Sequence, residues 1–145
     1  MVFTMKMKLL KFLLYKLLDI MKRVALIINF LNPNEKYLLK CLNSILRQSY
    51  KKFSIFFIDN NSEEIYQKKI LFFLKKKKFK NFYYHNFSKT LTLPSARNFA
   101  VNLVLSQKIK FDYIGFCDSD DWWNKDWLNY LIKNSKNYDL LFSDG

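Results

Sequence analysis

The sequence predicts an α/β fold with a largely parallel sheet and helices on both faces. Continuous apolar runs of strand length, such as Val24–Asn29 and Phe53–Ile58, are typical of strands that are buried on both faces. Between these runs, apolar residues recur at helical spacing, as Leu38, Cys41 and Leu42 do. Regular alternation of strand and helix favours a parallel sheet with right-handed crossover connections.

The expected elements follow one another along the chain from Val24. Strands are expected over Val24–Asn29, Phe53–Ile58, Asn81–Tyr84, Tyr113–Cys117 and Asp139–Ser143. Helices are expected over Leu38–Gln48, from Glu63 to about Leu74, over Ala96–Ser106, and from about Asn124 to Asn134.

Capping residues support three of these helices. The turn Asn32-Pro33-Asn34 precedes the first helix, and Ser62 is expected to cap the second. Thr92 is expected to cap the third, with Pro94 in its first turn. The lysine run 75–78 is expected to be the solvated end of the second helix, where positive charge complements the helix dipole.

Composition indicates one globular domain with a basic surface. Of 145 residues, 50% are hydrophobic and 19% aromatic, with two Gly and two Pro, which excludes disordered, collagen-like and repeat chains. The net charge of +13 has two explanations, a coding bias toward Lys, Asn, Phe and Ile or an anionic membrane surface as partner. We expect no nucleic-acid partner, because the basic residues do not form one stripe with interleaved aromatics.

The chain divides into an extension over residues 1–22 and a domain over residues 23–145. The extension is apolar but interrupted by lysines, is shorter than the roughly 20 residues of a membrane-spanning helix, and lacks a signal-peptide cleavage site. Its weak amphipathicity permits a helix that packs on the domain or lies on a membrane surface. A translation start at Met21 is the alternative. We expect a cytoplasmic protein, with peripheral contact to the inner face of the membrane.

The most informative segment is the acidic loop Asp118-Ser119-Asp120-Asp121, which follows the strand Tyr113–Cys117 and precedes Trp122 and Trp123. Side chains alternate in extended backbone, so Asp118 and Asp120 can point the same way. Such oxygen ligands suit Mn²⁺ or Mg²⁺ shared with a substrate phosphate. A solvated turn is the alternative, but ligands of open α/β sheets bind at this end of the strands.

Other residues that could carry chemistry are expected to be structural. Cys41 and Cys117 fall on apolar positions and are expected in the core of a protein from a reducing compartment. His85 has no partner at ligand spacing. The chain has no glycine-rich phosphate loop, which counts against a kinase, another NTPase or an NAD enzyme.

Five polar segments follow in order along the chain: Asn29-Phe30-Leu31-Asn32 after the first strand, Ser44-Ile45-Leu46-Arg47-Gln48-Ser49-Tyr50 at the end of a helix, Ile58-Asp59-Asn60-Asn61-Ser62 after the second strand, Ser95-Ala96-Arg97-Asn98 at a helix start, and the acidic loop. Together, over about Val24 to Leu131, they resemble family 2 glycosyltransferases of the GT-A fold. The resemblance implies a GT-A fold that binds a nucleotide-diphosphate-sugar donor.

The resemblance also implies roles for single residues. Asn29 and Asp59, with Asn60, would lie around the base and ribose of the donor. Asp118 and Asp120 would hold the Mn²⁺ or Mg²⁺ against the diphosphate. Arg97 would contact phosphate or pair with Asp59, and an ion pair that joins two loops is the alternative. One of the two tryptophans would offer a stacking face to a sugar, or pack under the following helix.

Two departures from the family pattern stand out, Asn29 in place of a proline and Asn60 in place of a second carboxylate. Asn60 puts a hydrogen-bond donor where the family has acceptors, which places the usual uracil preference in doubt. The catalytic base of the family lies in an acceptor-side segment, so we expect it beyond Gly145 and assign none here.

The expected function is therefore inverting, metal-dependent transfer of a sugar to a glycan or lipid-linked acceptor, in the synthesis of cell-surface polysaccharide or lipooligosaccharide. The alternative is a fragment or remnant that binds the donor without catalysis.

Overall fold

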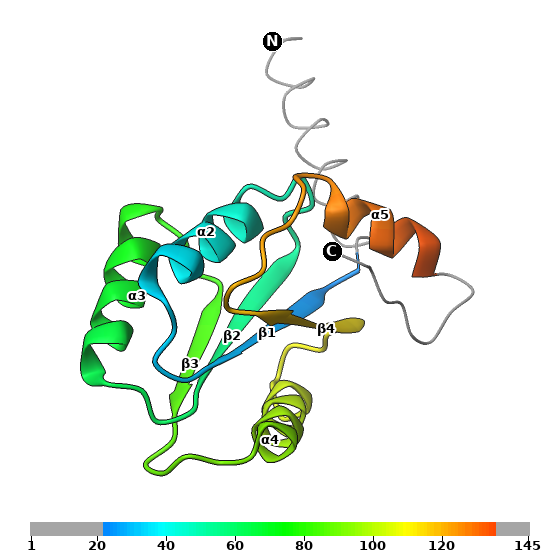
Figure 1. Cartoon of the computed structure of the whole chain (residues 1–145). Helices are drawn as coiled ribbons and strands as arrows, with labels where there is room; N and C mark the ends of the chain where they lie inside the picture. Colours follow the sequence, from blue (N-terminus) through cyan, green and yellow to red (C-terminus); the bar gives the residue numbers. More distant parts are fainter. Residues whose placement is uncertain (1–21, 136–145) are drawn as a thin grey trace, which may run out of the picture.

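The computed structural model describes residues 22–135 of the chain. Eight elements follow in the order β1 (Val24–Phe30), α2 (Glu35–Leu46), β2 (Phe53–Asp59), α3 (Glu64–Lys76), β3 (Phe82–Asn86), α4 (Leu93–Leu105), β4 (Tyr113–Asp118) and α5 (Trp127–Asn134) (Figure 1). The predicted strand Asp139–Ser143 lies outside the described residues, as does the extension except for Lys22.

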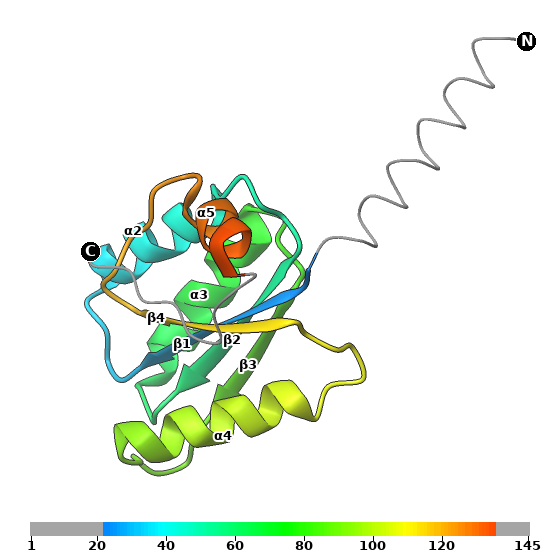
Figure 2. The ribbon, with the colours of Figure 1, turned by 90° about the vertical axis from the view of Figure 1, so that its right-hand side faces the viewer.

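All four strands pair in parallel, in the order β3-β2-β1-β4, as the alternation of strand and helix predicts. The central strand β1 has Ala25, Leu26, Ile27 and Ile28 almost fully buried, because helices cover both of its faces. The helices α2, α3 and α5 lie on one face and α4 lies on the other (Figure 2). None of the described helices has the length and apolar character needed to span a membrane.

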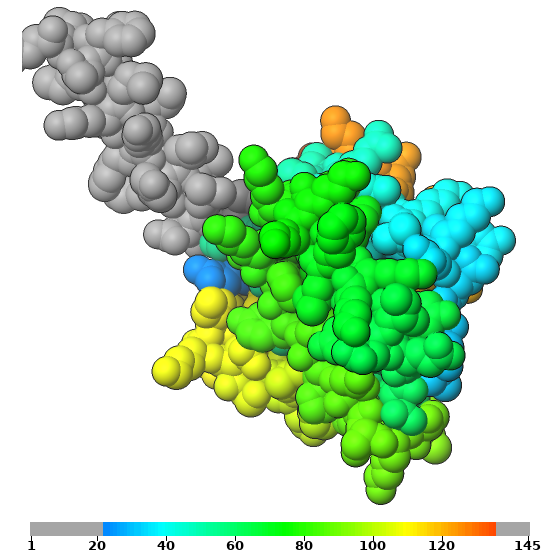
Figure 3. Space-filling view, turned by 90° about the vertical axis from the view of Figure 1, so that its left-hand side faces the viewer, coloured from blue at the N-terminus to red at the C-terminus, as the bar shows by residue number. Residues whose placement is uncertain are grey.

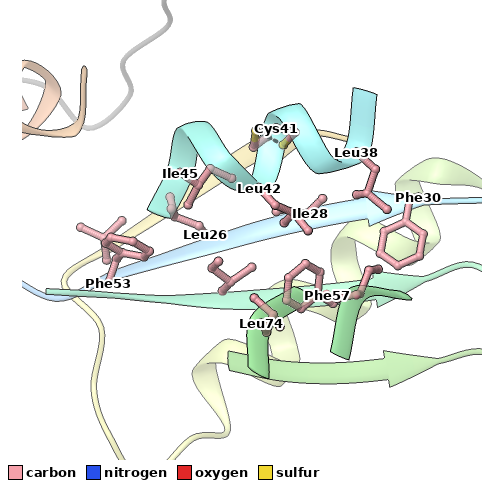
Figure 4. Packing of buried hydrophobic residues seen from close by; sticks show 14 of the residues in the cluster. Leu26, Ile28, Phe30, Leu38, Cys41, Leu42, Ile45, Phe53, Phe57 and Leu74 are labelled. Carbon is pink, nitrogen blue, oxygen red and sulfur yellow. Dashed lines mark hydrogen bonds between the residues drawn. The ribbon is translucent and has the colours of Figure 1, made fainter. Parts of the chain in front are cut away.

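The larger core lies between the sheet and the α2–α3 layer. Alternate strand residues such as Leu26, Ile28 and Phe57 point into it and meet Leu42 of α2 and Leu74 of α3 (Figure 4). The second core packs the opposite strand residues against small and β-branched side chains of α4, namely Ala96, Ala100 and Val104. The two small alanines bring α4 close to the sheet.

Cys41 and Cys117 are buried in the larger core, as predicted. Their Sγ atoms lie 3.8 Å apart, where α2 crosses the end of β4. The contact with Cys41, together with burial, raises the pKa of the Cys117 thiol, so it stays protonated and behaves as a small apolar group. His85 packs against the rings of Phe87 and Phe99, which agrees with a structural role.

Two of the predicted caps are confirmed and one is wrong. Asn34 accepts a hydrogen bond at the start of α2, and Thr92 accepts one from the Ser95 N–H at the start of α4. Ser62, however, does not cap α3. Glu63 is the residue at that cap position, without a side-chain hydrogen bond, because the Ser62 hydroxyl instead accepts from the backbone N–H of Asn32 at 2.8 Å.

Candidate functional site

The carboxyl ends of β1, β2 and β4 form one edge of the sheet, and the candidate site lies there. In the strand register, Asn29 of β1 stands opposite Ile58 of β2 on one side and Asp118 of β4 on the other. The loops after Asp59 and Asp118 therefore flank the same central strand, as predicted. In such sheets this edge is where ligands bind.

Three predicted site residues come together on the α4 face of this edge. Arg97, in the first turns of α4, places a guanidinium nitrogen 3.3 Å from a carboxylate oxygen of Asp118. The same guanidinium lies 5.6 Å from the centre of the Phe116 ring, which holds it over the end of β4. Strand alternation places Asn29 on this face as well, beside Asp118.

Two polar atoms in this group are buried and lack a partner among residues 22–135. They are the carbonyl oxygen Oδ1 of Asn29, an acceptor, and the Nε–H of Arg97, a donor. Buried polar atoms are nearly always hydrogen-bonded in folded proteins, and an exception calls for a specific cause such as a ligand or water. This face of the edge thus has an acceptor and a donor available for a polar ligand.

Asp59 lies on the opposite face of the sheet and is fully buried. One carboxylate oxygen accepts a hydrogen bond from the Ser62 N–H at 2.7 Å, and the other accepts from the Tyr84 hydroxyl at 2.6 Å. Of the alternatives for Arg97, the pairing with Asp59 is therefore wrong. Arg97 instead pairs with Asp118, because Asp59 follows the strand residues that face α2 and α3.

Tyr84 is a member of the site that sequence reasoning missed. Burial, followed by the hydrogen bond and the nearby charge of Asp59, raises the pKa of the Tyr84 hydroxyl. The hydroxyl consequently remains a proton donor, which is the state that a buried carboxylate needs. The only sequence signal is the alternation in β3, which puts Tyr84 on the same face as Asp59.

Both the nitrogen and the oxygen of the Asn60 side-chain amide form hydrogen bonds with the backbone of Leu91. Its Nδ2 donates to the Leu91 carbonyl oxygen at 2.9 Å, and its Oδ1 accepts from the Leu91 N–H at 2.8 Å. A carboxylate cannot donate a hydrogen bond, so aspartate would lose one of these bonds. The asparagine at this position therefore ties the loop after β2 to the segment that leads into α4.

The acidic loop is open to solvent, and its carboxylates extend from a tight turn. The backbone N–H of Asp121 donates to the carbonyl oxygen of Asp118 at 3.2 Å, while Asp118, Asp120 and Asp121 are exposed. The described residues contain no cluster of three acidic, His or Cys side chains that could hold a metal ion. A cation held by Asp118 and Asp120 would have to take its other ligands from phosphate oxygens and water, as Mg²⁺ commonly does in nucleotide sites.

The segment that continues this loop is fastened to the end of α2, a second feature that sequence reasoning missed. The Nε2 of the fully buried Gln48 donates to the Asn124 carbonyl oxygen at 2.6 Å, and its Oε1 accepts from the Leu128 N–H at 3.0 Å. The Ser44 hydroxyl accepts from the Trp123 N–H at 3.0 Å. Ser44 and Gln48 belong to one of the motif segments, and their polarity on a predicted amphipathic helix was the available signal.

The two tryptophans of the loop have different environments. Trp123 is half-buried and stacks on Trp127 of α5, with 4.3 Å between ring centres, as one alternative predicts. Trp122 is 52% exposed, and the ammonium of Lys40 lies 3.1 Å from its ring centre. Of this pair, Trp122 is the one with an accessible ring.

The chain is an α/β protein with a parallel sheet and an acidic loop at the edge where such sheets bind ligands. Residues 25–143 match the model of the family "Glycosyl transferase family 2". The chain belongs to this family, and the predicted resemblance is confirmed. No curated protein sequence was found to match it.

Solved structures confirm the GT-A fold. Residues 1–349 of TarS from S. aureus match with a TM-score of 0.65 and 22% identity, over 80% of this chain and 33% of that one. The same part of TarS in complex with UDP-GlcNAc matches with a TM-score of 0.63 and 22% identity, over 80% and 32%. The mannosyltransferase PcManGT from Pyrobaculum calidifontis, in complex with GDP-Man and Mn²⁺, matches with a TM-score of 0.70 and 17% identity, over 81% and 33%. The chain thus spans about a third of these three chains.

Proposed function

We propose that this chain binds a nucleotide-diphosphate sugar at the carboxyl edge of β1, β2 and β4, for transfer of the sugar to a glycan or lipid-linked acceptor. The observation that carries the proposal is the group formed by Asn29, Arg97 and Asp118, because it combines an exposed carboxylate with a buried acceptor and a buried donor that have no partner within residues 22–135. Family membership supports the same reading. TarS and PcManGT were solved with UDP-GlcNAc and GDP-Man respectively.

The residues of the edge divide into those that meet the donor and those that hold the loops. The Oδ1 of Asn29 would accept from an N–H or O–H of the base or ribose, since it has no partner among the described residues. Arg97 would direct its Nε–H at a phosphate, which a guanidinium suits in charge and geometry. Asp59 and Asn60 would shape the base and ribose pocket through backbone contacts, because their side chains are already hydrogen-bonded.

Asp118 and Asp120 would hold Mn²⁺ or Mg²⁺, the ion seen with PcManGT being Mn²⁺. The bound cation would supply neutralisation of the negative charge that develops on the diphosphate leaving group. The ion pair between Arg97 and Asp118 is half-exposed, with 39% and 61% of the two side chains accessible, so a competing cation can displace it at small energetic cost.

We further propose an inverting single displacement, in the synthesis of cell-surface polysaccharide or lipooligosaccharide, at the cytoplasmic face of the membrane with peripheral contact to it. Direct displacement needs a base that removes the proton of the acceptor hydroxyl. None of the described carboxylates is assigned to this role. Binding of the nucleotide is therefore tested separately from transfer of the sugar.

Isothermal titration calorimetry with UDP and with GDP, each with and without Mn²⁺, tests donor binding. We expect binding only with the metal, and at least a tenfold weaker affinity, about 1.4 kcal/mol, in the Asp118→Ala/Asp120→Ala double variant. The matched control, Glu35→Ala/Glu64→Ala, removes two exposed carboxylates from α2 and α3 and should bind as the unmodified chain does. Equal, metal-independent binding by all three proteins would show that the acidic loop holds no metal.

A further inference from the structure

A basic groove lies on the opposite side of the sheet from Asn29 and Arg97. It has a volume of about 850 Å³ and runs between the outer face of α2, the end of α3 and the loop that follows β4. Five of its lining residues are cationic: Lys36, Lys40, Arg47, Lys77 and Lys125. None of its lining residues is acidic. Figure 3 shows α3 (green) beside α2 (cyan), with part of the loop after β4 (orange) beyond α2.

Within residues 22–135, no carboxylate forms an ion pair with any of the five cations. The ion pairs of the described residues use other cations, namely Lys22, Lys68, Lys69 and Arg97. The carboxylate nearest in sequence to Lys36, that of Glu35, is paired with Lys69 of α3. Like charges held along one groove repel one another, so an anionic ligand that enters the groove gains the attraction of all of them.

The spacing of the cations indicates the shape of the ligand. Lys36 and Arg47 are eleven positions apart along the same helix and its cap, which corresponds to roughly 16 Å at 1.5 Å per residue. A single phosphate is too small to contact both ends of this row unless the two long side chains fold toward its middle. An extended ligand that carries phosphates at several points can engage more of the cations at once. The concave form favours a chain, which contacts both walls, over a flat bilayer, which would meet only the rims.

The aromatic side chains distinguish between kinds of chain. Trp122 presents an accessible ring with Lys40 over it, whereas Trp123 is stacked on Trp127. Proteins that bind single-stranded nucleic acid stack successive bases on several aromatic rings. One accessible ring among the groove residues is too few for that mode of binding, although it can support one cyclic group between phosphates.

We propose that this groove is a second binding site, for an extended polyanion whose repeating phosphates lie along α2. The groove is distinct from the Asn29, Arg97 and Asp118 group, none of which lines it, although both places adjoin the loop after β4. The loop after β4 forms one wall, and its attachment to α2 through Ser44 and Gln48 keeps that wall in place without a ligand. In Figures 1 and 2 this loop runs beside α2.

The test measures binding of long-chain inorganic polyphosphate to the full chain by calorimetry over a series of salt concentrations. We expect affinity to rise from orthophosphate to tripolyphosphate to the long chain, because only the long chain reaches every cation. In the variant Lys36→Gln/Lys40→Gln/Arg47→Gln, affinity for the long chain should fall at least about tenfold, and the slope of log affinity against log salt should decrease by about three.

The matched control is Lys89→Gln/Lys108→Gln/Lys110→Gln, which removes three exposed cations near the two ends of α4. It should bind long-chain polyphosphate within about twofold of the unmodified chain at physiological ionic strength and above, since salt screens charges that lie far from the groove. Equal losses in the two triple variants would overturn the proposal, because binding would then follow only the net charge. Circular dichroism of both variants checks that each is folded before binding is compared.

Two further arms separate the sources of phosphate. A single-stranded oligonucleotide with the same number of phosphates should bind more weakly than polyphosphate, and tighter binding would assign the groove to nucleic acid instead. Vesicles of phosphatidylcholine and phosphatidylglycerol should not compete with polyphosphate for the groove. Binding to vesicles alone would overturn the proposal in favour of a membrane surface. Loss of UDP or GDP binding in the Asp118→Ala/Asp120→Ala variant, with polyphosphate binding intact, would show that the two sites are separate.

Discussion

The buried hydrogen bond from Tyr84 to Asp59 is the sharpest place to test how the candidate site is held together. Tyr84→Phe removes one hydroxyl and keeps the ring, so the ring contacts with Phe30 and Phe57, at 6.3 and 6.0 Å between centres, are retained. Among the described residues, the fully buried carboxylate of Asp59 then keeps only the hydrogen bond from the Ser62 N–H. The change therefore isolates one hydrogen bond to a buried charge.

The expected cost follows from that environment. Hydrogen bonds to charged groups contribute about 1.5–3 kcal/mol, and the removal of a donor leaves a buried acceptor unsatisfied. We expect the free energy of unfolding to fall by about 2 kcal/mol, which corresponds to a decrease in Tm of roughly 8 °C for a domain of this size. In an Asp59→Asn background the same substitution should cost about 1 kcal/mol, because a neutral amide accepts a weaker hydrogen bond than a carboxylate does.

Urea unfolding at pH 7, followed by circular dichroism, measures each variant, and the four proteins of the double-mutant cycle give the coupling energy. Tyr83→Phe is the matched control, because Tyr83 stacks on Phe56 and its hydroxyl has no hydrogen bond with a described residue. It should change stability by less than about 0.5 kcal/mol. If Tyr84→Phe is no more destabilising than Tyr83→Phe, then Asp59 is not buried as a charged acceptor and the reasoning fails.

Two further predictions concern the base of the sheet and the attachment of the acidic loop. The backbone N–H of Arg23, at 2.7 Å, is the main cause that lowers the pKa of Asp112. A lowered carboxyl pKa stabilises the fold at pH values above the unfolded pKa of about 3.9, and this stabilisation is lost as the pH falls through the folded pKa. Below about pH 5 the unmodified chain should therefore lose stability more steeply than Asp112→Asn. The midpoints of urea unfolding, measured at a series of acid pH values, test this. Gln48→Leu leaves the Leu128 N–H without its acceptor and should lower the free energy of unfolding by about 3 kcal/mol. The control Gln107→Leu changes a half-buried residue just after α4, whose amide donates to the Leu103 carbonyl oxygen, and should cost under about 1 kcal/mol. Similar costs for the two glutamine variants in urea unfolding would show that the loop is not held by Gln48.

Most of the fold follows from local pattern. The four described strands were each predicted to within two residues at either end, because each apolar run ends where a loop begins. β1 and β2 are buried on both faces, whereas β3 and β4 are only partly buried. Helices α2, α3 and α4 were predicted from apolar spacing and turn residues. The start of the last helix was placed three residues early, at Asn124 instead of Trp127, because Asn124 and Asp126 look like helix-start residues but form turns against α2.

The candidate site was predicted less completely, and the reason is the direction of side chains. Asp59 and Asp118 both end strands at one edge, which sequence alone indicates, yet they point to opposite faces. The choice of Asp118 as the partner of Arg97 depends on which layer α4 joins. Ser62 was predicted to cap α3, but its hydroxyl accepts a hydrogen bond from the backbone N–H of Asn32, in the loop after β1. This contact between two loops could not be read from the local sequence.

Sequence is therefore sufficient for the family, the parallel α/β fold and the position of the acidic loop, because these depend on periodicity and on motifs that are contiguous along the chain. The tertiary structure was needed to show that Asn29, Arg97 and Asp118 form one group, and that the cations of α2 line a groove with the loop after β4. Hydrogen bonds and charge interactions act over a few ångströms in space, while their partners here lie tens of residues apart along the chain. Which of those partners meet depends on which face of the sheet each helix packs against.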